Sequence, residues 1–344
     1  VHDGRGDFHV APNQNVLNMG RGGTRPSRAM KLFFCYLFST AIVSAAVGPV
    51  GLVGTKANPN QVERLQITKP GIYENYLVDS RGAGGNRVKI TADNVTLRHC
   101  EIRNASGNGI GVFANNVLIE NCKIHHLLAG SFEQQHDAHG ITGRWGNVTI
   151  RNCDIGLISG DCIQFDPDRR SVGRVIIENC RLWTGPLPAD AGRFKKGQRP
   201  GENAVDTKTR PQGARAELII RNSIFHGWKQ PGQISLLAAL NLKEHVNARV
   251  EQCVFFDNQV AFRLRGPTRR GGAWVRIDRC VVYDTEVGVR AEETIENLKI
   301  NRLGFARSVK RPFHTPGCDF GKGHENKGQF VAPDLEQILR NGIK

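Results

Sequence analysis

The chain has 344 residues and carries 47 Lys and Arg against 32 Asp and Glu, a formal net charge of +15. This length is sufficient for one sizeable domain with its own core. The positive excess favours an anionic partner, such as an acidic polysaccharide, a nucleic acid or a charged surface. No nucleic-acid-binding module is recognisable, which argues against nucleic acid, and the sequence contains neither a CxxC pair nor a His/Cys spacing typical of zinc.

The N-terminal part is typical of targeting sequence. Residues 1–29 are rich in Gly, Arg and Asn and have no apolar periodicity, so we interpret them as an upstream extension. Residues 30–57 open with Met30 and one lysine, continue as an apolar run and pass through small residues, which predicts a secretory signal peptide. A single membrane anchor is the alternative, but Gly and Pro interrupt the distal half of the run. We expect a secreted or periplasmic protein with no membrane contact after cleavage, and its remaining residues keep +11 of the net charge.

The middle of the chain is built of repeats. Eight segments begin at intervals of 22, 31, 27, 43, 30, 27 and 23 residues, which indicates a solenoid whose coils carry insertions. The segments are VTLRHCEI (95–102), VLIENCKI (117–124), VTIRNCDI (148–155), VIIENCRL (175–182), LIIRNSIF (218–225), ARVEQCVF (248–255), VRIDRCVV (275–282) and LKINRLGF (298–305).

Each repeat predicts a strand, a tight corner and a second strand. Positions 1, 3, 6 and 8 are mostly apolar or Cys, positions 2 and 4 are polar, and position 5 is Asn in four of the eight segments, a residue suited to corners. The fold class is therefore all-β, a right-handed parallel β-helix over residues 58–311 with short terminal caps. We expect residues 65–78 to form the first cap, and a short helix over 333–342 to form the second within a C-terminal tail, 312–344.

Six cysteines share position 6 of the repeat. In an exported protein they could form disulfides, but Ser223 and Leu303 occupy the same position, so we expect a buried apolar ladder of free thiols. The six are Cys100, Cys122, Cys153, Cys180, Cys253 and Cys280.

A further strand in each coil carries polar side chains in two outward rows. The strands are GITGR (140–144), CIQFD (162–166), AVDTK (204–208), ALNLK (239–243), AFRLR (261–265) and GVRAE (288–292), and a shift of two residues is an alternative for ALNLK. Since neighbouring strands lie about 4.8 Å apart, the outward side chains form a continuous polar strip. Its first row is Thr142, Gln164, Asp206, Asn241, Arg263 and Arg290, and its second row is Arg144, Asp166, Lys208, Lys243, Arg265 and Glu292.

Stacked cations repel each other, so the strip requires either an anionic ligand or interleaved acids. Two long insertions, 127–138 and 185–201, fall just before this strand and predict the wall of a groove. The residues that we expect to bind the anion are Arg144, Arg265, His136, His139, Lys196 and Arg199.

The strings ENAVDTKT (202–209) and ALNLKEH (239–245) resemble motifs of the β-helical polysaccharide lyases, in particular the alginate lyase and chondroitinase B family and the lysine-dependent pectate lyases. In that family one coil presents an acid followed by Lys, and the next coil presents Arg followed by His. Lys243 stands where Arg is usual, and His245 follows it. The resemblance covers residues 60–310 and implies β-elimination of a uronate polysaccharide by a monomeric enzyme.

The residue types suit that chemistry. Lys208 would be the base, Arg263 and Arg265 would bind carboxylates, and Lys243 or His245 would supply the acid. An oxygen-rich set fits Ca²⁺ beside the substrate carboxylate, with simple ion pairing as the alternative; it comprises Glu202, Asp206, Asp166, Asp161 and Asp168. His139 aligns with Asp161 and Asn203, so a structural polar corner is a second interpretation of that histidine. Three other functions stay open: an inverting glycoside hydrolase, a uronate epimerase and a non-catalytic polyanion-binding solenoid.

Overall fold

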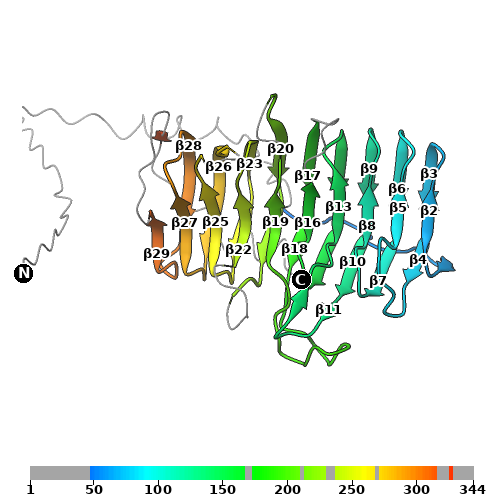
Figure 1. Ribbon diagram of the computed structural model, residues 1–344. Helices are drawn as coiled ribbons and strands as arrows, with labels where there is room; N and C mark the ends of the chain where they lie inside the picture. Colours follow the sequence, from blue (N-terminus) through cyan, green and yellow to red (C-terminus); the bar gives the residue numbers. More distant parts are fainter. Residues whose placement is uncertain are drawn as a thin grey trace, which may run out of the picture. The chain divides into compact units, whose positions relative to one another are not determined.

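The computed structural model describes residues 47–166, 173–209, 213–229, 237–267, 271–315 and 325–327. Their strands stack side by side along one axis, from β2 at one end to β29 at the other (Figure 1). Apart from one short antiparallel hairpin, every strand pairing in this part of the chain is parallel, and no helix occurs in it. The all-β, parallel β-helix prediction is confirmed.

One wall of the solenoid is a ten-stranded parallel sheet with one strand from each coil. Successive strands pair in register, for example Ile141 with Ile163 and Ile163 with Val205. The strands are β2 (Leu65–Ile67), β5 (Val88–Ile90), β8 (Ile110–Val112), β13 (Ile141–Arg144), β16 (Ile163–Asp166), β19 (Asn203–Thr207), β22 (Ala238–Leu242), β25 (Val260–Arg265), β27 (Val287–Glu292) and β29 (Arg311–His314).

The remaining walls are formed by the second sheet, to which most coils contribute two strands, one on each side of the repeat corner. In its last coils the two strands merge into one. Its strands are β1 (Asn60–Val62), β3 (Gly71–Glu74), β4 (Tyr76–Asp79), β6 (Val95–Arg98), β7 (Glu101–Ala105), β9 (Val117–Glu120), β10 (Lys123–Leu127), β14 (Val148–Arg151), β15 (Asp154–Ile158), β17 (Arg174–Glu178), β18 (Arg181–Trp183), β20 (Ala216–Arg221), β21 (Ile224–His226), β23 (Val246–Glu251), β24 (Val254–Phe256), β26 (Trp274–Tyr283), β28 (Asn297–Phe305) and β30 (Glu325–Lys327).

The corner between the paired strands is a single residue in the left-handed conformation. All eight residues at position 5 have φ between 50° and 54°. Asn tolerates this conformation best, and its amide can bond to the next corner, as Asn152 Nδ2 does to Asn121 Oδ1 at 2.6 Å. The eight corner residues are His99, Asn121, Asn152, Asn179, Asn222, Gln252, Arg279 and Arg302.

The core fills the interior of the coils with Val, Ile, Leu and Cys. The six cysteines of position 6 are buried and free, as predicted, and Cys162 is also buried. Burial raises the pKa of the thiols of Cys122, Cys153 and Cys180 well above the ordinary value, so these groups stay protonated and act as small apolar side chains.

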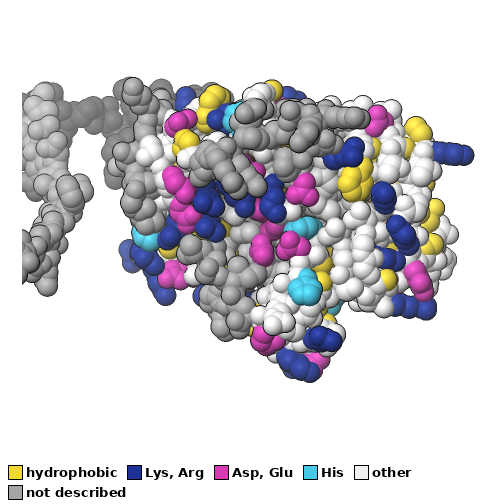
Figure 2. Space-filling view, viewed as in Figure 1, with side chains coloured by type: hydrophobic (Ala, Val, Ile, Leu, Met, Phe, Trp, Pro, Cys, Tyr) yellow, Lys and Arg dark blue, Asp and Glu magenta, His cyan; other side chains and the backbone are white. Residues whose placement is uncertain are grey.

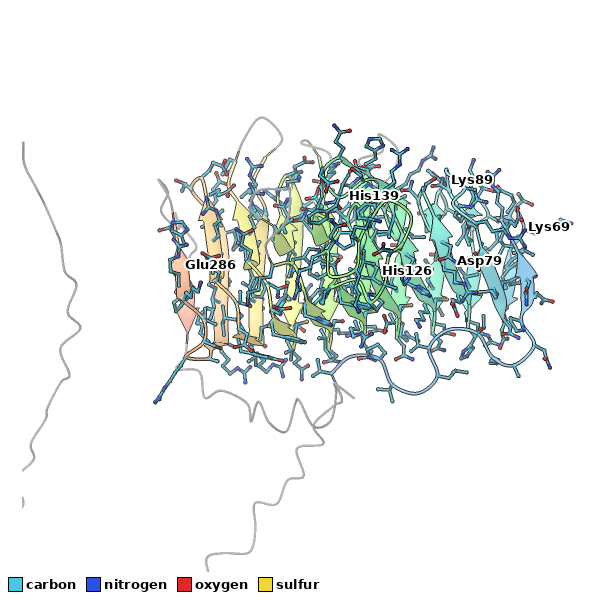
Figure 3. The ribbon with its side chains drawn as sticks, turned by 90° about the horizontal axis from the view of Figure 1, so that it is seen from below. Lys69, Asp79, Lys89, His126, His139 and Glu286 are labelled. Atoms are coloured by element: carbon cyan, nitrogen blue, oxygen red, sulfur yellow. The ribbon has the colours of Figure 1, made fainter. Side chains whose placement is uncertain are left out.

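An N-terminal strap, residues 47–59, lies along the corners of several coils and forms the pale blue segment below the strands in Figure 3. Four backbone N–H groups of the strap donate to corner residues: Gly48 to Asn222 O at 2.8 Å, Val50 to Asn152 Oδ1 at 2.5 Å, Gly54 to Asn121 O at 2.8 Å and Lys56 to Asn75 Oδ1 at 2.7 Å. Most of this strap falls in the segment 30–57 that we predict as a signal peptide. The rest of that segment, and residues 1–29, lie outside the described residues.

Neither predicted cap is present among the described residues. Residues 65–78 form strands β2, β3 and part of β4 of the first coil, so the expectation of a cap there is wrong. The predicted helix at 333–342 lies outside the described residues. No helix long and apolar enough to cross a bilayer was found in the described part of the chain.

The two insertions pack against each other outside the main core. Phe132 of the first insertion shares a small apolar cluster with Leu187 and Phe194 of the second, and the β15 residue Leu157 completes it. Within the first insertion, β11 (Ala129–Gly130) and β12 (Gln135–His136) form the antiparallel hairpin. Gln135 Oε1 accepts a bond from the Gly201 N–H at 2.8 Å, so the insertions form one continuous wall.

Candidate functional site

The two predicted rows occur on the outer face of the ten-stranded sheet. Strand pairing aligns Gln164 with Thr142 and Asp206, and Asn241 with Asp206 and Arg263. Leu240 pairs with Val205, so the ALNLK strand has the predicted register and not the alternative shifted by two. Gln164, Asp206 and Asn241 are at most 5 % exposed, although they face outward. A polar row this buried is costly unless each group has partners, and its contacts therefore define the site.

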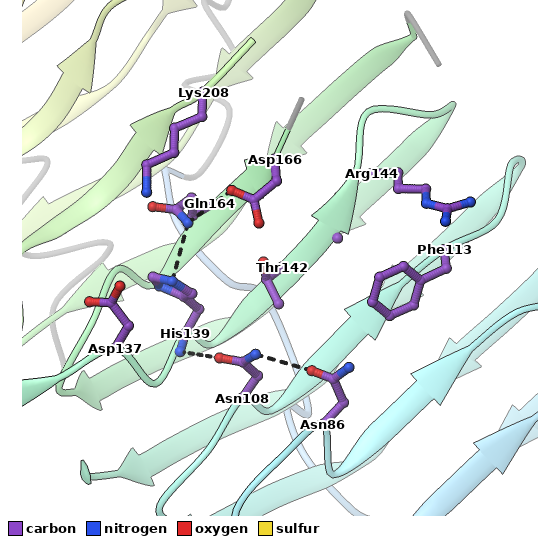
Figure 4. Close-up of a pocket in the computed structure, with 11 residues that line it drawn as sticks. Asn86, Asn108, Phe113, Asp137, His139, Thr142, Arg144, Gln164, Asp166 and Lys208 are labelled. Atoms are coloured by element: carbon purple, nitrogen blue, oxygen red, sulfur yellow. Dashed lines mark hydrogen bonds between the residues drawn. The ribbon is translucent and has the colours of Figure 1, made fainter. Parts of the chain in front are cut away.

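An open cavity of about 700 Å³ lies over this row, on strands β8, β13 and β16 (Figure 4). It carries two acidic and two basic side chains and one aromatic ring. Its lining residues are Asn86, Asn108, Phe113, Asp137, His139, Thr142, Gly143, Arg144, Gln164, Asp166 and Lys208. Gly143 has φ of 137°, and a Cβ atom there would lie 1.9 Å from the Val112 carbonyl oxygen, so only glycine fits this part of the cavity floor.

A chain of buried hydrogen bonds runs along the residues that precede the strands. The His139 N–H donates to Asn108 Oδ1 at 2.8 Å, and the Asp161 N–H donates to His139 Nδ1 at 3.1 Å. Asn203 Nδ2 then donates to Asp161 Oδ1 at 2.8 Å. His139 is 6 % exposed, and burial lowers its pKa. The geometry is compatible with both predicted roles of His139. Its hydrogen bonds make it a structural polar corner residue, and it also lines the cavity.

Three carboxyl groups lie close to this chain, and burial raises the pKa of each. Asp161 is fully buried, and Asp206 and Glu202 raise its pKa further by repulsion. Desolvation is also the largest cause for Glu202 and for Asp206, although Lys243 opposes it at Asp206. Asp161 Oδ2 and Asp206 Oδ1 have no hydrogen-bond partner among the described residues.

The predicted Ca²⁺ ligands do not form a metal site in the described part of the chain. No three His, Cys, Asp or Glu side chains converge there on one point. Asp206 instead accepts from Lys243 at 3.0 Å, and Asp161 accepts from Asn203. Asp168 lies outside the described residues. The four described members of the set therefore lack the convergence that a Ca²⁺ site needs, and Ca²⁺ binding stays a prediction.

Most cations of the strip are paired with interleaved acids. Arg263 and Arg290 both bond Glu292, at 3.0 and 2.7 Å. Arg265 lies 3.5 Å from Glu292 and 3.2 Å from Glu293. Figure 2 shows dark blue and magenta side chains intermingled on this face. At these positions the repulsion between cations is therefore relieved by interleaved acids and not by an anionic ligand.

Lys208 differs from these cations. No acid within the described ranges lies within ion-pair distance of its ammonium group, which lines the cavity. A buried tryptophan holds the backbone of Lys208. The Trp145 indole N–H donates to Lys208 O at 2.6 Å and to Phe165 O at 3.1 Å. The cavity thus combines a rigidly held, half-buried Lys208 with His139, Gln164 and Arg144.

Four of the predicted residues lie away from this cavity. Arg199 bonds Asp257 at 2.8 Å and the Gly227 carbonyl, and Lys196 is exposed on the second insertion. His136 is exposed on β12, and the adjacent Asp137 lines the cavity in its place. His245 follows the left-handed corner at Glu244 and lies beside Gly271.

Sequence reasoning missed several residues of the site. Asn86 and Asn108 precede their strands at the same position as His139, and this shared position was a usable signal. Trp145 gave no signal, because its bond reaches Lys208, 63 positions later. Nothing in the sequence indicated that Phe113 belongs to the site. The Arg144 guanidinium lies 5.7 Å from the centre of the Phe113 ring.

A family model described as "Right handed beta helix region" matches residues 86–305. No curated protein matches the sequence. Among solved structures, the alginate lyase from Paenibacillus sp. str. FPU-7 is similar, with a TM-score of 0.53 and 16 % identity, over 74 % of this chain and 84 % of that one. Pectate lyase Pel9A gives a TM-score of 0.38 and 15 % identity, over 85 % of this chain and 77 % of its own. The tailspike protein gp49 from Acinetobacter baumannii bacteriophage Fri1, a capsular polysaccharide depolymerase, gives a TM-score of 0.37 and 10 % identity. The match covers 78 % of this chain and 51 % of the tailspike chain. At these identities the likeness concerns the fold.

Proposed function

Since the chain belongs to the right-handed β-helix family, we propose that its ten-stranded face binds an acidic polysaccharide and that the protein is a secreted polysaccharide lyase. The single observation that carries this proposal is the placement of Lys208. Its amine lines an open cavity, and no described acid is close enough to neutralise it. Arg144 lines the same cavity and can receive the carboxylate of a uronate residue.

The proposed reaction is β-elimination. Lys208, as the general base, accepts the C5 proton of the uronate, and the released electron pair forms the C4=C5 double bond while the C4–O4 bond breaks. The departing O4 takes a proton from a general acid. Lys243, one coil further along the second row and paired with Asp206, is the candidate donor. The products are a new sugar end and an unsaturated uronate, and no water or oxidant is consumed.

The arginine cluster has a different role in this proposal from the one that the sequence suggests. Arg263, Arg265 and Arg290 already bond to Glu292 and Glu293, so they bind a second carboxylate only in competition with those acids. We assign them to distant subsites of a long substrate and not to the reacting uronate.

The test compares the full chain with its Lys208→Ala variant on alginate, polygalacturonate, chondroitin and dermatan sulfates, heparin and hyaluronate. Unsaturated uronate absorbs in the ultraviolet, so elimination gives a rise in absorbance. We expect such a rise on at least one polymer, and a loss of about 10²- to 10⁴-fold in the variant, the usual contribution of a general base. Lys195→Ala is the matched control, because it removes one surface ammonium that pairs with Asp190 in the second insertion.

Three outcomes contradict the proposal in different ways. New reducing ends without absorbance indicate a hydrolase. A change of uronate configuration without cleavage indicates an epimerase. Binding of a polyanion without either change indicates a recognition surface. Parallel reactions with EDTA and with added Ca²⁺ test the predicted metal: a loss of rate in EDTA that Ca²⁺ restores supports it, and an unchanged rate contradicts it.

A further inference from the structure

The His139 imidazole is faced by an N–H donor at each of its nitrogens. The Asp161 backbone N–H points at Nδ1 from 3.1 Å, and the Gln164 side-chain nitrogen lies 3.2 Å from Nε2 (Figure 4). A neutral imidazole has one lone pair and one N–H, so it satisfies only one of these donors. An imidazolium satisfies neither, because both of its nitrogens carry hydrogen.

The geometry favours a proton on Nε2. Asp161 Oδ2 lies 3.8 Å from Nδ1, too far to accept a hydrogen bond from it, whereas the Asp161 backbone N–H donates to Nδ1. The backbone N–H of Asp161 belongs to a buried residue, 0 % exposed, and cannot turn. The Gln164 amide can turn by 180°, since the orientation of an amide is an assignment and not an observation. Turning it places Oε1 opposite Nε2 and ends its 3.2 Å bond to Asp166. Asp166 is exposed, so water replaces that bond. Nδ1 therefore carries the lone pair and Nε2 carries the proton.

Nε2–H lies on the cavity side of the ring. Gln164 and His139 both line the cavity, as does Lys208. A ligand oxygen that replaces the Gln164 carbonyl receives a hydrogen bond from a donor held in place by a buried backbone group. His139 is 6 % exposed, so its ring is already ordered before a ligand arrives.

We propose that His139 acts as a neutral hydrogen-bond donor that binds the uronate carboxylate through Nε2–H, beside Lys208, and that Asp161 is the positioning residue that fixes this tautomer. The assignment rests on the lyase function proposed above. When the C5 proton leaves, negative charge spreads onto the carboxylate oxygens, and a preorganised donor stabilises that charge more in the transition state than in the ground state. A neutral imidazole suits this task, because it donates without giving up its proton.

The tautomer can be measured without any substrate. The chain contains 11 histidines, so the nitrogen resonances of His139 are assigned in a ¹⁵N-labelled sample as those that vanish in the His139→Gln variant. We expect Nδ1 to give the resonance of an unprotonated nitrogen and Nε2 that of a protonated one at neutral pH. Protonated Nδ1, or protonation of both nitrogens, would overturn the proposal.

Activity tests the role. His139→Phe removes the donor, and we expect kcat to fall about 10²-fold with little change in KM, the usual effect of losing one oxyanion-type donor. His139→Gln replaces it with an amide N–H and should recover part of that loss. His125→Phe is the control, because it changes a histidine on β10 of the second sheet that does not line the cavity.

The outcomes separate this inference from the proposed function. If the wild type forms unsaturated uronate and His139→Phe is as active as the wild type, the donor role alone is wrong. If Phe and Gln variants are equally inactive, the ring acts in some other way and the donor role is again wrong. If the wild type forms no unsaturated uronate on any polymer, the lyase function itself fails, and the donor role falls with it whatever the tautomer.

Discussion

The half-buried His226 on β21 makes stability depend on pH. Its ring stacks between Trp183, with centroids 6.1 Å apart, and Phe256, with centroids 4.6 Å apart. Burial lowers its pKa from 6.5 to about 4, and the nearby Arg181 adds to the shift. In the unfolded chain the ring gains a proton as pH falls through 6.5, whereas in the folded chain it does so only near 4. Stability is therefore complete above pH 6.5 and is lost as pH falls towards 4.

The size of this effect follows from the two pKa values. At pH 4.5 almost all unfolded molecules carry the proton and only about a quarter of folded ones do, which corresponds to about 2.5 kcal/mol of stability lost relative to neutral pH. His226→Phe keeps a planar ring in the stack but cannot titrate. We expect the variant to lose about 2.5 kcal/mol less than the wild type between about pH 7 and about pH 4.5.

Urea unfolding followed by circular dichroism at the two pH values measures this difference. Other titrating groups, including His126, whose pKa burial also lowers to about 4, are present in both proteins and cancel. Equal pH-dependent losses in the wild type and the variant would refute the reasoning, because they would mean that the ring gains its proton in the folded state as readily as in the unfolded chain.

Two further predictions concern the strap and the support of Lys208. A chain that begins at Asn58 should be about 4 kcal/mol less stable in urea than one that begins at Val47, because four strap N–H bonds to corner residues are lost, at about 1 kcal/mol each. Equal midpoints would contradict this. Trp145→Phe should cost about 2 kcal/mol or more in urea unfolding, because it leaves two carbonyls, those of Phe165 and Lys208, without their donor. It should also lower activity more than Trp274→Phe, a change at a more exposed tryptophan; equal activities would show that the bond does not position Lys208.

The repeat made the fold predictable from the sequence, because each coil repeats the same packing problem. Cys100 and Cys122 stack since they share one position, and Asn121 and Asn152 adopt the same left-handed corner for the same reason. The ends of the solenoid have no such repeated information. We expected a cap at residues 65–78, but the segment pairs with the next coil as ordinary strands.

The rows of the site were predictable, but their partners were not. Alternation along each strand placed Lys208 and Lys243 correctly in one outward row. Which acid each cation bonds depends on the side-chain conformation across coils. Lys243 turns to Asp206 in the other row, and Arg199 turns away from the groove to Asp257. The contact between Trp145 and Lys208 joins residues two coils apart, so no local pattern could indicate it.

The pairing of charges along the strip also explains why one lysine is singled out. Each outward side chain of a solenoid has fixed neighbours about 4.8 Å away on the adjacent coils. In the coils from β25 to β27, acids and arginines alternate, and the charges compensate locally. Around β19 the compensation is incomplete: Asp206 pairs with Lys243, and no described acid lies within ion-pair distance of Lys208. A ligand carboxylate that enters the cavity meets a lysine that forms no ion pair with a described acid. Among the described cations of the strip, Lys208 is therefore the one best placed for the carboxylate of the proposed substrate.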